Sequence, residues 1–466
     1  MKPTLPVSQP ATSRQCWGVI ADDLTGATDT AAAFAVHGFA TVVVLNRRAR
    51  LPHAAEVIVL TTDSRHDSPR VARRKVRRAC AWLRARGVRV LYKKMDSTLH
   101  GNIVAEVEAI RDAAGFACAL VCPANPAQGR IVRRGVLFVR GKKAAELPAH
   151  FAAQGLRDAT AVRSPVRAGE VSAAICSESR FVIADAVSRR DLARLARAAL
   201  NAPASVLLAG SAGLAGTLAE LLARKKAPSP PQSRRHLRGS TEAERVARRT
   251  IPAGPVLVLS GSRNPVTERQ LEVLLRADRA RLLALEDGGR PVIPTQPTGT
   301  ESLIVRLPIH QRSETEIQCR LTDLNPLLRE RRVSGLLLTG GDTALLVARW
   351  LRISSITIRG EIVPGLAWGH IVGGLADGLA VCTKPGGFGD ERSIARAVAV
   401  FKGNAILRKH GAQPGGVSKA VPKQLEPRTR LETSVRRMRP RKIPCKQGDR
   451  GGTPLNAFVW QRRPRA

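Results

Sequence analysis

A buried strand and the helix after it are predicted by Trp17-Gly-Val-Ile-Ala-Asp-Asp-Leu-Thr-Gly-Ala-Thr-Asp29. The apolar run from Gly18 to Ala21 is long enough for one strand, and helical spacing of apolar residues follows from Ala27. The strand stops at two carboxylates, Asp22 and Asp23. In open α/β sheets, ligands bind at the carboxyl ends of the strands. The stretch therefore predicts an α/β fold with acidic groups at its binding edge.

The start of this helix has two interpretations. Thr25 is a candidate N-cap, and the free N–H groups of a helix N-terminus can bind an anion. Alternatively, Asp22 and Asp23 are turn and cap residues without any contact to a ligand.

Composition favours anionic partners. The chain has 466 residues and a formal net charge of +39, which is suited to phosphorylated ligands or nucleic acid. Its length suits two or three domains, and 44% hydrophobic residues allow a large core built from Ala, Leu and Val, since aromatics are only 3%. The eight cysteines lack zinc-ligand spacing, no stretch is apolar enough to span a membrane, and residues 1–14 lack the apolar core of a secretory signal. These features predict a cytoplasmic protein.

Apolar strands alternate with amphipathic helices along the chain. Strands are expected at 40–45, 57–60, 88–92, 116–122, 181–185 and 205–209, and helices begin at Pro69, near Ile103 and at Asp191. This order predicts two domains, each a mainly parallel sheet with helices on both faces and an active site in the cleft between them. The expected boundaries are 15–224 for the first domain, 225–254 for a Pro- and Arg-rich linker, 255–403 for the second domain and 404–466 for a tail.

Two polar loops of the first domain carry candidate ligand contacts. In Lys94-Met-Asp-Ser-Thr-Leu-His-Gly101, Lys94 can hold a carboxylate or phosphate, Asp96 can accept a proton, and Ser97 and Thr98 can bind a polyol. The alternative is that Asp96 or Ser97 caps the next helix. In the loop that ends at Gly129-Arg130, the arginine is either an anion clamp or an exposed base on a turn.

Three strands of the second domain run into small-residue turns. These turns are Ser260-Gly-Ser262, Gly340-Gly-Asp-Thr343 and Pro385-Gly-Gly-Phe-Gly389. Glycines let backbone N–H groups face phosphate oxygens, and the hydroxyls of Ser260 and Thr343 add donors. None of the turns has the Gly-Lys-Ser/Thr ending of a Walker P-loop. A purely structural role for each turn is the alternative.

These motifs, in this order, resemble the four-carbon acid sugar kinase family, whose members phosphorylate D-erythronate, D-threonate or 3-oxo-tetronate. The resemblance rests on 21–29, 94–102 and 123–130, and it continues to about Lys402. It implies an N-terminal domain that binds the sugar acid, a C-terminal domain that binds ATP, and transfer of the γ-phosphoryl group to the terminal hydroxyl, with Mg²⁺ as cofactor.

The resemblance also implies roles for individual residues. The catalytic candidates are Asp22, Asp23 and Asp96, arranged around the sugar acid and Mg²⁺, and no metal ligand is assigned. The substrate-binding candidates are Thr25, Lys94, Ser97, Thr98 and Arg130, with Lys94 and Arg130 on the substrate carboxylate. The candidates for ATP contacts are Ser260, Gly340, Gly341, Asp342, Thr343, Gly386 and Gly387.

Departures from the family pattern leave two other functions open. The family usually has arginine where His100 stands, and 142–161 matches its pattern poorly. A relic that keeps the fold without turnover is therefore one alternative, and a basic nucleic-acid-binding protein is the other. The tail from 404 to 466 is rich in Lys and Arg and poor in apolar periodicity, which is typical of disorder and suited only to nonspecific nucleic-acid binding. The expected partners are the sugar acid and ATP, with a homodimer as a candidate assembly and no membrane.

Overall fold

The predicted strand and helix at the start of the chain are confirmed. The computed structural model describes residues 16–49, 51–52, 54–226, 254–277, 280–284, 301–309 and 312–403. Strand β1 spans Trp17–Ala21 and helix α1 spans Leu24–Ala35. The N-cap of α1 is Asp23 and not Thr25, because the Asp23 side chain accepts a hydrogen bond from the Gly26 N–H at 2.9 Å. Thr25 lies inside the first turn, where its hydroxyl donates to Asp23 Oδ2 at 2.6 Å.

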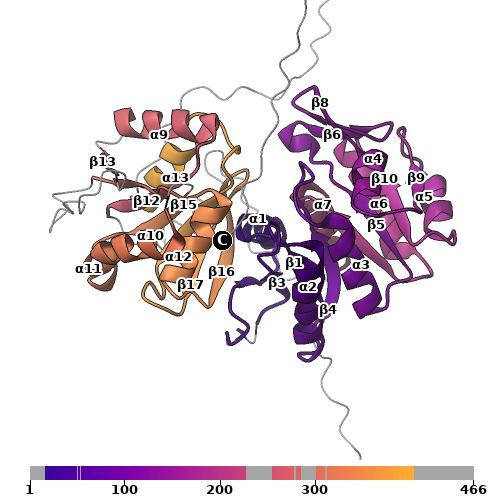
Figure 1. Cartoon of the computed structure of the whole chain (residues 1–466), viewed down its shortest axis with the longest axis horizontal. Coiled ribbons are helices and arrows are strands. Elements are labelled where there is room, and N and C mark those ends of the chain that lie inside the picture. The colour runs from indigo at the N-terminus through magenta and orange to yellow at the C-terminus, as the bar shows by residue number, and fades with distance from the viewer. Residues whose placement is uncertain are drawn as a thin grey trace, which may run out of the picture. The chain divides into compact units, whose positions relative to one another are not determined.

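The N-terminal half of the described chain, from β1 to α7, alternates strands and helices as expected (Figure 1). Its further elements are β2 Thr41–Val44, β3 Val57–Thr61, α2 Pro69–Arg84, β4 Arg89–Lys94, α3 Ile103–Ala114, β5 Cys118–Cys122, η1 Pro126–Gln128, β6 Arg130–Arg133, β7 Val136–Val139, β8 Lys142–Glu146, α4 Leu147–Ala153, β9 Thr160–Val162, α5 Ala168–Ile175, β10 Phe181–Ala184, α6 Arg189–Asn201, β11 Val206–Gly210 and α7 Ala212–Lys225.

The C-terminal half runs from β12 to α13. Its elements are β12 Val256–Ser260, α9 Pro265–Ala277, β13 Arg281–Ala284, β14 Leu303–Arg306, α10 Glu314–Leu321, η2 Thr322–Leu324, α11 Asn325–Arg329, β15 Gly335–Thr339, α12 Gly341–Trp350, β16 Ser355–Val363, β17 Leu366–Val372, β18 Ala380–Lys384 and α13 Ser393–Phe401. Most of the expected linker and the whole tail lie outside the described residues.

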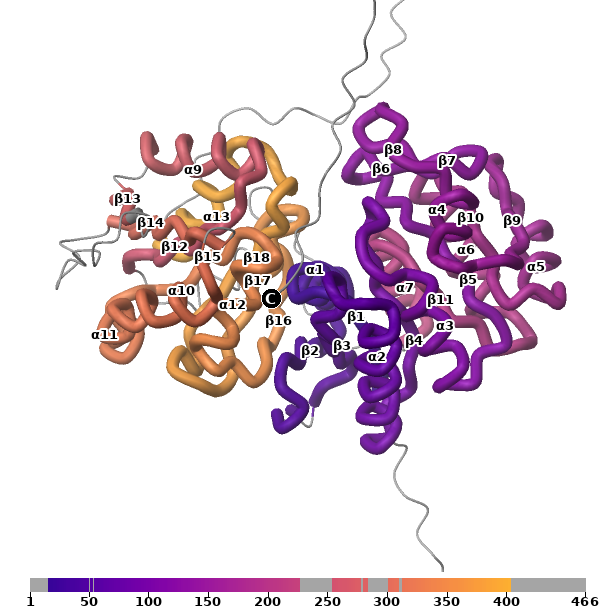
Figure 2. The backbone as a smooth tube through the Cα atoms, viewed as in Figure 1, coloured from indigo at the N-terminus to yellow at the C-terminus, as the bar shows by residue number. Residues whose placement is uncertain are grey.

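The two halves share one sheet, so the expectation of two separate sheets was wrong. The fifteen strands follow the order β13-β14-β12-β15-β18-β17-β16-β2-β3-β1-β4-β11-β5-β10-β9 (Figure 2). The hairpin β16–β17 is antiparallel, and β16 pairs antiparallel with β2 of the N-terminal half. The other main-sheet pairs are parallel except for β17 with β18. Strands β6, β7 and β8 form a separate antiparallel sheet.

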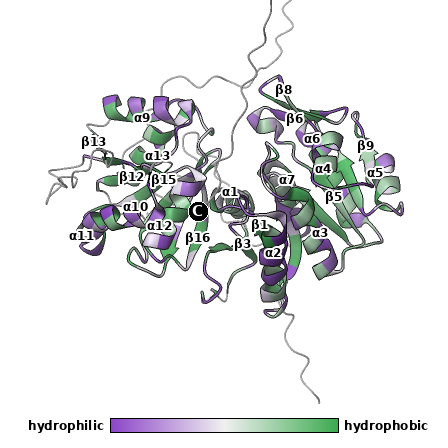
Figure 3. Cartoon of the chain, viewed as in Figure 1, coloured by the Kyte–Doolittle hydropathy of each residue, from purple (hydrophilic) through white to green (hydrophobic). Residues whose placement is uncertain are grey.

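Helices cover both faces of the sheet. In the N-terminal half α2 packs against α3, while α1, α7 and α6 pack in a row. In the C-terminal half α9 packs against α13, and α10 packs against α12. Figure 3 shows apolar residues along strands such as β5 and β12, and a mixture of polar and apolar residues on helices such as α10. Helix α1 also contacts β16, β17 and α12, so it belongs to the core of both halves.

No helix in the described ranges has both the length and the apolar composition required to cross a bilayer.

The hairpin that joins the halves provides a test of the fold. A Cβ at Gly369 of β17 would lie 2.2 Å from the carbonyl oxygen of Thr357 in β16. We expect Gly369→Ala to lower the free energy of unfolding by about 1–3 kcal/mol, because paired backbone cannot move aside freely. Gly169→Ala in α5 is the matched control, since no heavy atom lies within 4 Å of its added Cβ. Urea unfolding measures both, and equal effects would contradict the observed pairing.

Candidate active site

The polar loops of the N-terminal half start at one level of the sheet. Ala21 at the end of β1 pairs with Thr61 of β3 on one side and with Lys94 of β4 on the other. Lys94 in turn is level with Gly210 of β11. All these contacts are parallel, so the loops after the four strands meet at one edge. The acidic groups predicted after the first strand therefore lie at the carboxyl edge of the sheet.

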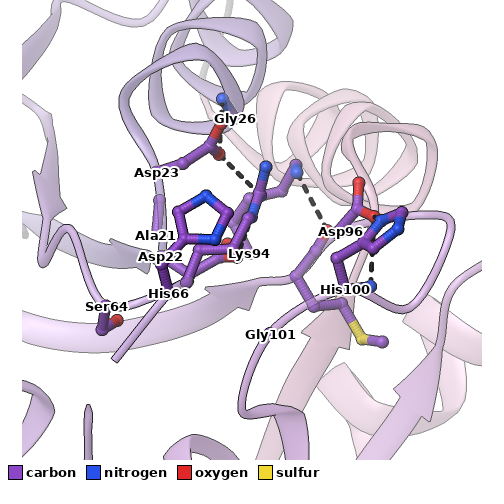
Figure 4. A network of polar contacts seen from close by, with 12 residues as sticks. Ala21, Asp22, Asp23, Gly26, Ser64, His66, Lys94, Asp96, His100 and Gly101 are labelled. Atoms are coloured by element: carbon purple, nitrogen blue, oxygen red, sulfur yellow. Dashed lines mark hydrogen bonds and ion pairs between the residues drawn. The ribbon is translucent and has the colours of Figure 1, made fainter. Parts of the chain in front are cut away.

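Arg65 lies between the two adjacent acids. Its Nε donates to Asp22 Oδ2 at 2.7 Å, and its Nη2 donates to Asp23 Oδ1 at 2.8 Å. Figure 4 shows Asp22, Asp23, Lys94 and Asp96 gathered at this edge, with His100 turned toward Asp96. Burial would raise the pKa of Asp22, but Lys93, Arg65 and Lys94 outweigh it and hold that pKa below its usual range. Asp22 is therefore ionised at neutral pH.

A second buried ion pair lies beside Asp22. Lys93 Nζ is 2.6 Å from Glu106 Oε2 of α3 and 3.9 Å from Asp22 Oδ1. The Ser64 hydroxyl donates to Glu106 Oε1 at 2.5 Å. Asp22 Oδ1 is buried and accepts no hydrogen bond from any described residue.

Asp96 organises its own loop and does not cap helix α3. Its Oδ2 accepts hydrogen bonds from the N–H groups of Thr98 and His100, each at 3.2 Å, and lies 2.8 Å from His100 Nδ1. The N-cap of α3 is Asn102. Burial would raise the pKa of Asp96, but hydrogen bonds from His100 and Thr98 and the charges of Arg65 and Lys94 lower it strongly. The same hydrogen bond to Asp96 raises the pKa of His100.

Each of the two candidate anion contacts, Arg130 and Lys94, is held by a hydrogen bond to its own loop or to a neighbouring one. Arg130 Nη1 donates to Ser97 Oγ at 2.8 Å, and the guanidinium lies over the ring of Phe388, 4.7 Å from its centre. Lys94 Nζ donates to the Met95 carbonyl at 2.9 Å. Arg130 is thus fixed between the N-terminal half and the last glycine turn, and it is not an exposed base on a turn.

Two buried acids near these cations behave differently from Asp22. Burial raises the pKa of Asp29 to about 6, although Lys94 and Arg130 oppose the rise. Burial and the charge of Asp29 raise the pKa of Glu361 in β16 to about 8. The site therefore holds acids that are ionised at neutral pH together with acids whose pKa lies within about one unit of neutral pH.

The glycine turns of the C-terminal half also start at one level. Ser260 pairs with Thr339, and Thr339 pairs with Lys384, all in parallel strands. Gly340 has a φ of 102°, which favours glycine, and its N–H donates to the Lys384 carbonyl at 2.9 Å. Helix α12 begins at Gly341 directly after this turn.

Hydrogen bonds from side chains hold the glycine turns in place. Thr343 Oγ1 accepts a hydrogen bond from the Gly261 N–H at 2.9 Å, and Ser260 Oγ is buried without a partner among the described residues. Lys384 donates to the carbonyl oxygens of Pro385 and Gly386 at 3.0 and 2.8 Å. Burial lowers the pKa of Lys384 to about 7.

The two sets of motifs meet. A Cβ at Gly341 would lie 3.2 Å from Asp23 Oδ2 and 3.4 Å from Thr25 Oγ1. Asp342 Oδ1 is 3.7 Å from His66 Nε2. The hydroxyls of Thr28 in α1 and Thr383 in β18 are 2.7 Å apart. The N-terminus of α12 therefore lies against the acidic start of α1, whereas Gly386 and Gly387 lie nearer Ser262 and Asn264.

The acids do not form a ready-made Mg²⁺ site. Among the described residues there is no group of three His, Cys, Asp or Glu side chains that could hold a metal. Arg65 already binds both Asp22 and Asp23, so a positive charge stands between the carboxylates that a metal would share. Proteins usually bind Mg²⁺ through one or two carboxylates and substrate phosphates. The present arrangement does not fit a resident ion.

Sequence reasoning missed Arg65, Lys93, Glu106, Asp29 and Lys384. Arg65 follows a strand that neighbours β1, so the rule that identified Asp22 could have found it. Lys93 adjoins the assigned Lys94, and Asp29 ends the quoted motif. Glu106 gives no such signal, because an acid in the first turn of a helix is an ordinary helix-start residue.

Comparison with known proteins identifies the family. Residues 17–159 and 141–218 match a sugar-binding N-terminal domain, and residues 283–394 match a nucleotide-binding C-terminal domain. A D-threonate kinase of Bordetella bronchiseptica is 32% identical over 425 residues, which cover 83% of this chain and 97% of the relative. The chain belongs to the four-carbon acid sugar kinase family. A 3-oxo-tetronate kinase of Pseudomonas fluorescens is 28% identical over 84% of this chain and 98% of that relative.

A solved structure shares the fold of this chain. A solved protein from Salmonella typhimurium matches with a TM-score of 0.65 at 24% identity, over 82% of this chain and 98% of the other. The expected enzyme class is confirmed: this is a sugar-acid kinase of a nucleotide-binding family, and the family implies ATP as the donor. The homodimer and the cytoplasmic location stay predictions.

The raised pKa of Glu361 predicts a pH-dependent stability. Its proton is held more tightly in the folded protein than in the unfolded chain, where the pKa is 4.5, so stability falls as pH rises from 4.5 through about 8. We expect Glu361→Gln to raise the free energy of unfolding above pH 8 by on the order of 1–3 kcal/mol, with no gain at pH 4.5.

Urea unfolding at pH 4.5, 7 and 9 measures the difference. Glu170→Gln in α5 is the control, since that side chain is 48% exposed and its substitution should change the free energy of unfolding little. An equal gain for Glu361→Gln at every pH would contradict the prediction.

Proposed function

We propose that this kinase transfers the γ-phosphoryl group of ATP to the terminal hydroxyl of a four-carbon sugar acid, such as threonate, erythronate or 3-oxo-tetronate. The observation that carries the proposal is the close approach of Gly341 to Asp23 and Thr25, whose side-chain oxygens would lie 3.2 and 3.4 Å from an added Cβ. It puts the start of a helix from the nucleotide-binding half against a carboxylate of the sugar-binding half. Transfer of a group between two bound substrates requires their binding sites to adjoin in this way.

The nucleotide phosphates would bind at the start of α12. The free N–H groups of a helix N-terminus attract anions, and the missing side chain at Gly341 lets phosphate oxygens approach the backbone. Gly386 and Gly387 offer a second turn of this kind, which Lys384 holds through the Gly386 carbonyl. Asp342 is 55% exposed, so its side chain suits an outer position and not a buried phosphate contact.

The sugar acid would bind between Asp96 and Arg130. Arg130 and Lys94 supply positive charge for its carboxylate, and Ser97 and Thr98 supply hydroxyls for its polyol chain. Asp23 lies nearest the start of α12, so it is placed to orient the reacting hydroxyl and to accept its proton. Arg65 would neutralise charge that develops beside Asp22 and Asp23.

This scheme assigns one substrate to each predicted domain, residues 15–224 for the sugar acid and 255–403 for ATP. The two family matches support the assignment, as does the position of each motif set at one edge of its own half. Mg²⁺ dependence stays a prediction from the chemistry of phosphoryl transfer. Nonspecific nucleic-acid binding by 404–466 concerns residues outside the described ranges.

Release of ADP across a panel of four-carbon acids tests the proposal. Turnover should require both ATP and one of the acids, with and without added Mg²⁺ compared in the same assay. If folded protein releases no ADP with any of these acids, the proposal is wrong. That result would favour a family member that keeps the fold but has lost its activity.

The roles of the acids predict selective losses of rate. We expect Asp23→Asn and Asp96→Asn to lower kcat by at least about 100-fold with little change in ATP affinity, because each acts mainly in the transition state. Asp191→Asn is the matched control, since Asp191 belongs to the capping box of α6, as Asp23 caps α1.

Asparagine caps a helix nearly as well as aspartate, so a purely structural Asp23 would tolerate the change. Measured kcat, KM and Tm separate the two roles. Near-normal kcat in Asp23→Asn and Asp96→Asn would show that both acids are structural. A fall in kcat that merely follows a fall in Tm would show the same.

A further inference from the structure

Lys93 and Glu106 bury a complete ion pair that the proposed chemistry does not use. The two side chains are 1% and 2% exposed, and their charged atoms are 2.6 Å apart. Lys93 Nζ also donates to the Lys94 carbonyl at 2.6 Å. Both residues therefore have their polar groups satisfied deep in the core, between β4 and α3.

Stability alone does not explain this pair. Removing two charges from water is costly, and apolar side chains of similar volume often serve a core as well or better. The position of the pair offers another explanation. Lys93 Nζ lies 3.9 Å from Asp22 Oδ1, and that oxygen accepts no hydrogen bond from the described residues. The Lys93 ammonium thus places a positive charge within ion-pair distance of this buried oxygen.

We propose that Lys93, anchored by Glu106, is a positioning residue that holds the Asp22 carboxylate ionised and fixed in the active site. Glu106 binds one of the cations that face Asp22 and reaches the loop that carries another. It binds Lys93 directly, and its other oxygen accepts from Ser64, the residue before Arg65. The Ser64 N–H donates to the Asp22 carbonyl at 3.0 Å, which closes the network.

The charges that face Asp22 come from three elements. Arg65 comes from the loop after β3, Lys93 and Lys94 come from β4, and Glu106 comes from α3 behind Lys93. His100 and Asp96 lie on the far side of Arg65, in the loop after β4. Without Lys93, Asp22 would keep Arg65 on Oδ2 but would lose the cation beside Oδ1, and its pKa should rise.

The decisive variant removes both charges together, because loss of one would leave the other buried and unpaired. Lys93→Met with Glu106→Leu keeps volume and apolar packing. Val107→Ala is the matched control, since it removes buried packing from the same turn of α3 without touching a charge. If the Met/Leu pair fails to fold, Lys93→Gln with Glu106→Gln keeps a hydrogen bond across the site without either charge.

The first measurement is independent of activity. The carboxyl carbon of Asp22, assigned by its loss in Asp22→Asn, is titrated by NMR in full-length protein. We expect its midpoint to rise by at least about one pH unit in the charge-free pair and to stay unchanged in Val107→Ala. An unchanged midpoint in a folded charge-free pair would overturn the proposal.

The second measurement concerns turnover, and it rests on the proposed kinase activity. With Asp22 more easily protonated, the acid limb of the kcat–pH profile should move to higher pH by the same amount as the NMR midpoint, while KM for ATP changes less than about twofold. Raising the pH should restore part of the rate. Normal kcat throughout, beside a shifted midpoint, would refute the catalytic consequence. A wild-type protein without turnover would refute the proposed function, and the NMR midpoint would still decide the role of Lys93.

Discussion

The pairing of β2 with β16 is the constraint on which the site depends. Four residue pairs, from Ser355 with Val44 to Ile358 with Thr41, join the two halves into one sheet. Three successive antiparallel contacts separate β2 from β18, so the parallel strands of the two halves run in opposite directions. In a flat sheet their carboxyl ends would lie at opposite edges.

Twist resolves this conflict. Neighbouring strands rotate by about 20–25°, so the six steps from β1 to β15 accumulate to roughly 120–150°. Such a rotation turns the carboxyl ends of the C-terminal strands toward the carboxyl ends of the N-terminal strands. It accounts for the close approach of Gly341 to Asp23. The continuous sheet also limits closure of the site, because the halves cannot separate as independent bodies without breaking the β2–β16 hydrogen bonds.

Local patterns predicted the elements well and their pairing poorly. Apolar runs ending in polar or glycine-rich turns located most of the strands that carry the site, since burial and turn chemistry are encoded within a few residues. The pairing of Val42–Val44 with 355–357 joins segments over three hundred residues apart, and no local signal encodes it. Glu106 was missed for a related reason: it acts through Lys93 and Ser64, which only the fold brings near. The sequence left the N-cap open between Thr25 and the acids before it, because both residue types suit the position, and only the geometry selects Asp23.

The same strand pairing affects how the chain folds during synthesis. Strand β2 is Thr-Val-Val-Val, and its side chains are 0–2% exposed in the finished sheet. On the ribosome, its partner β16 emerges about three hundred residues later, which takes roughly 15–60 s at about 5–20 residues per second. Until then the nascent N-terminal half presents an apolar edge strand with unpaired N–H and C=O groups, the type of surface that recruits a neighbouring chain. A sheet that unites two substrate sites thus leaves the growing polypeptide dependent on protection from aggregation while it waits for its own C-terminal half.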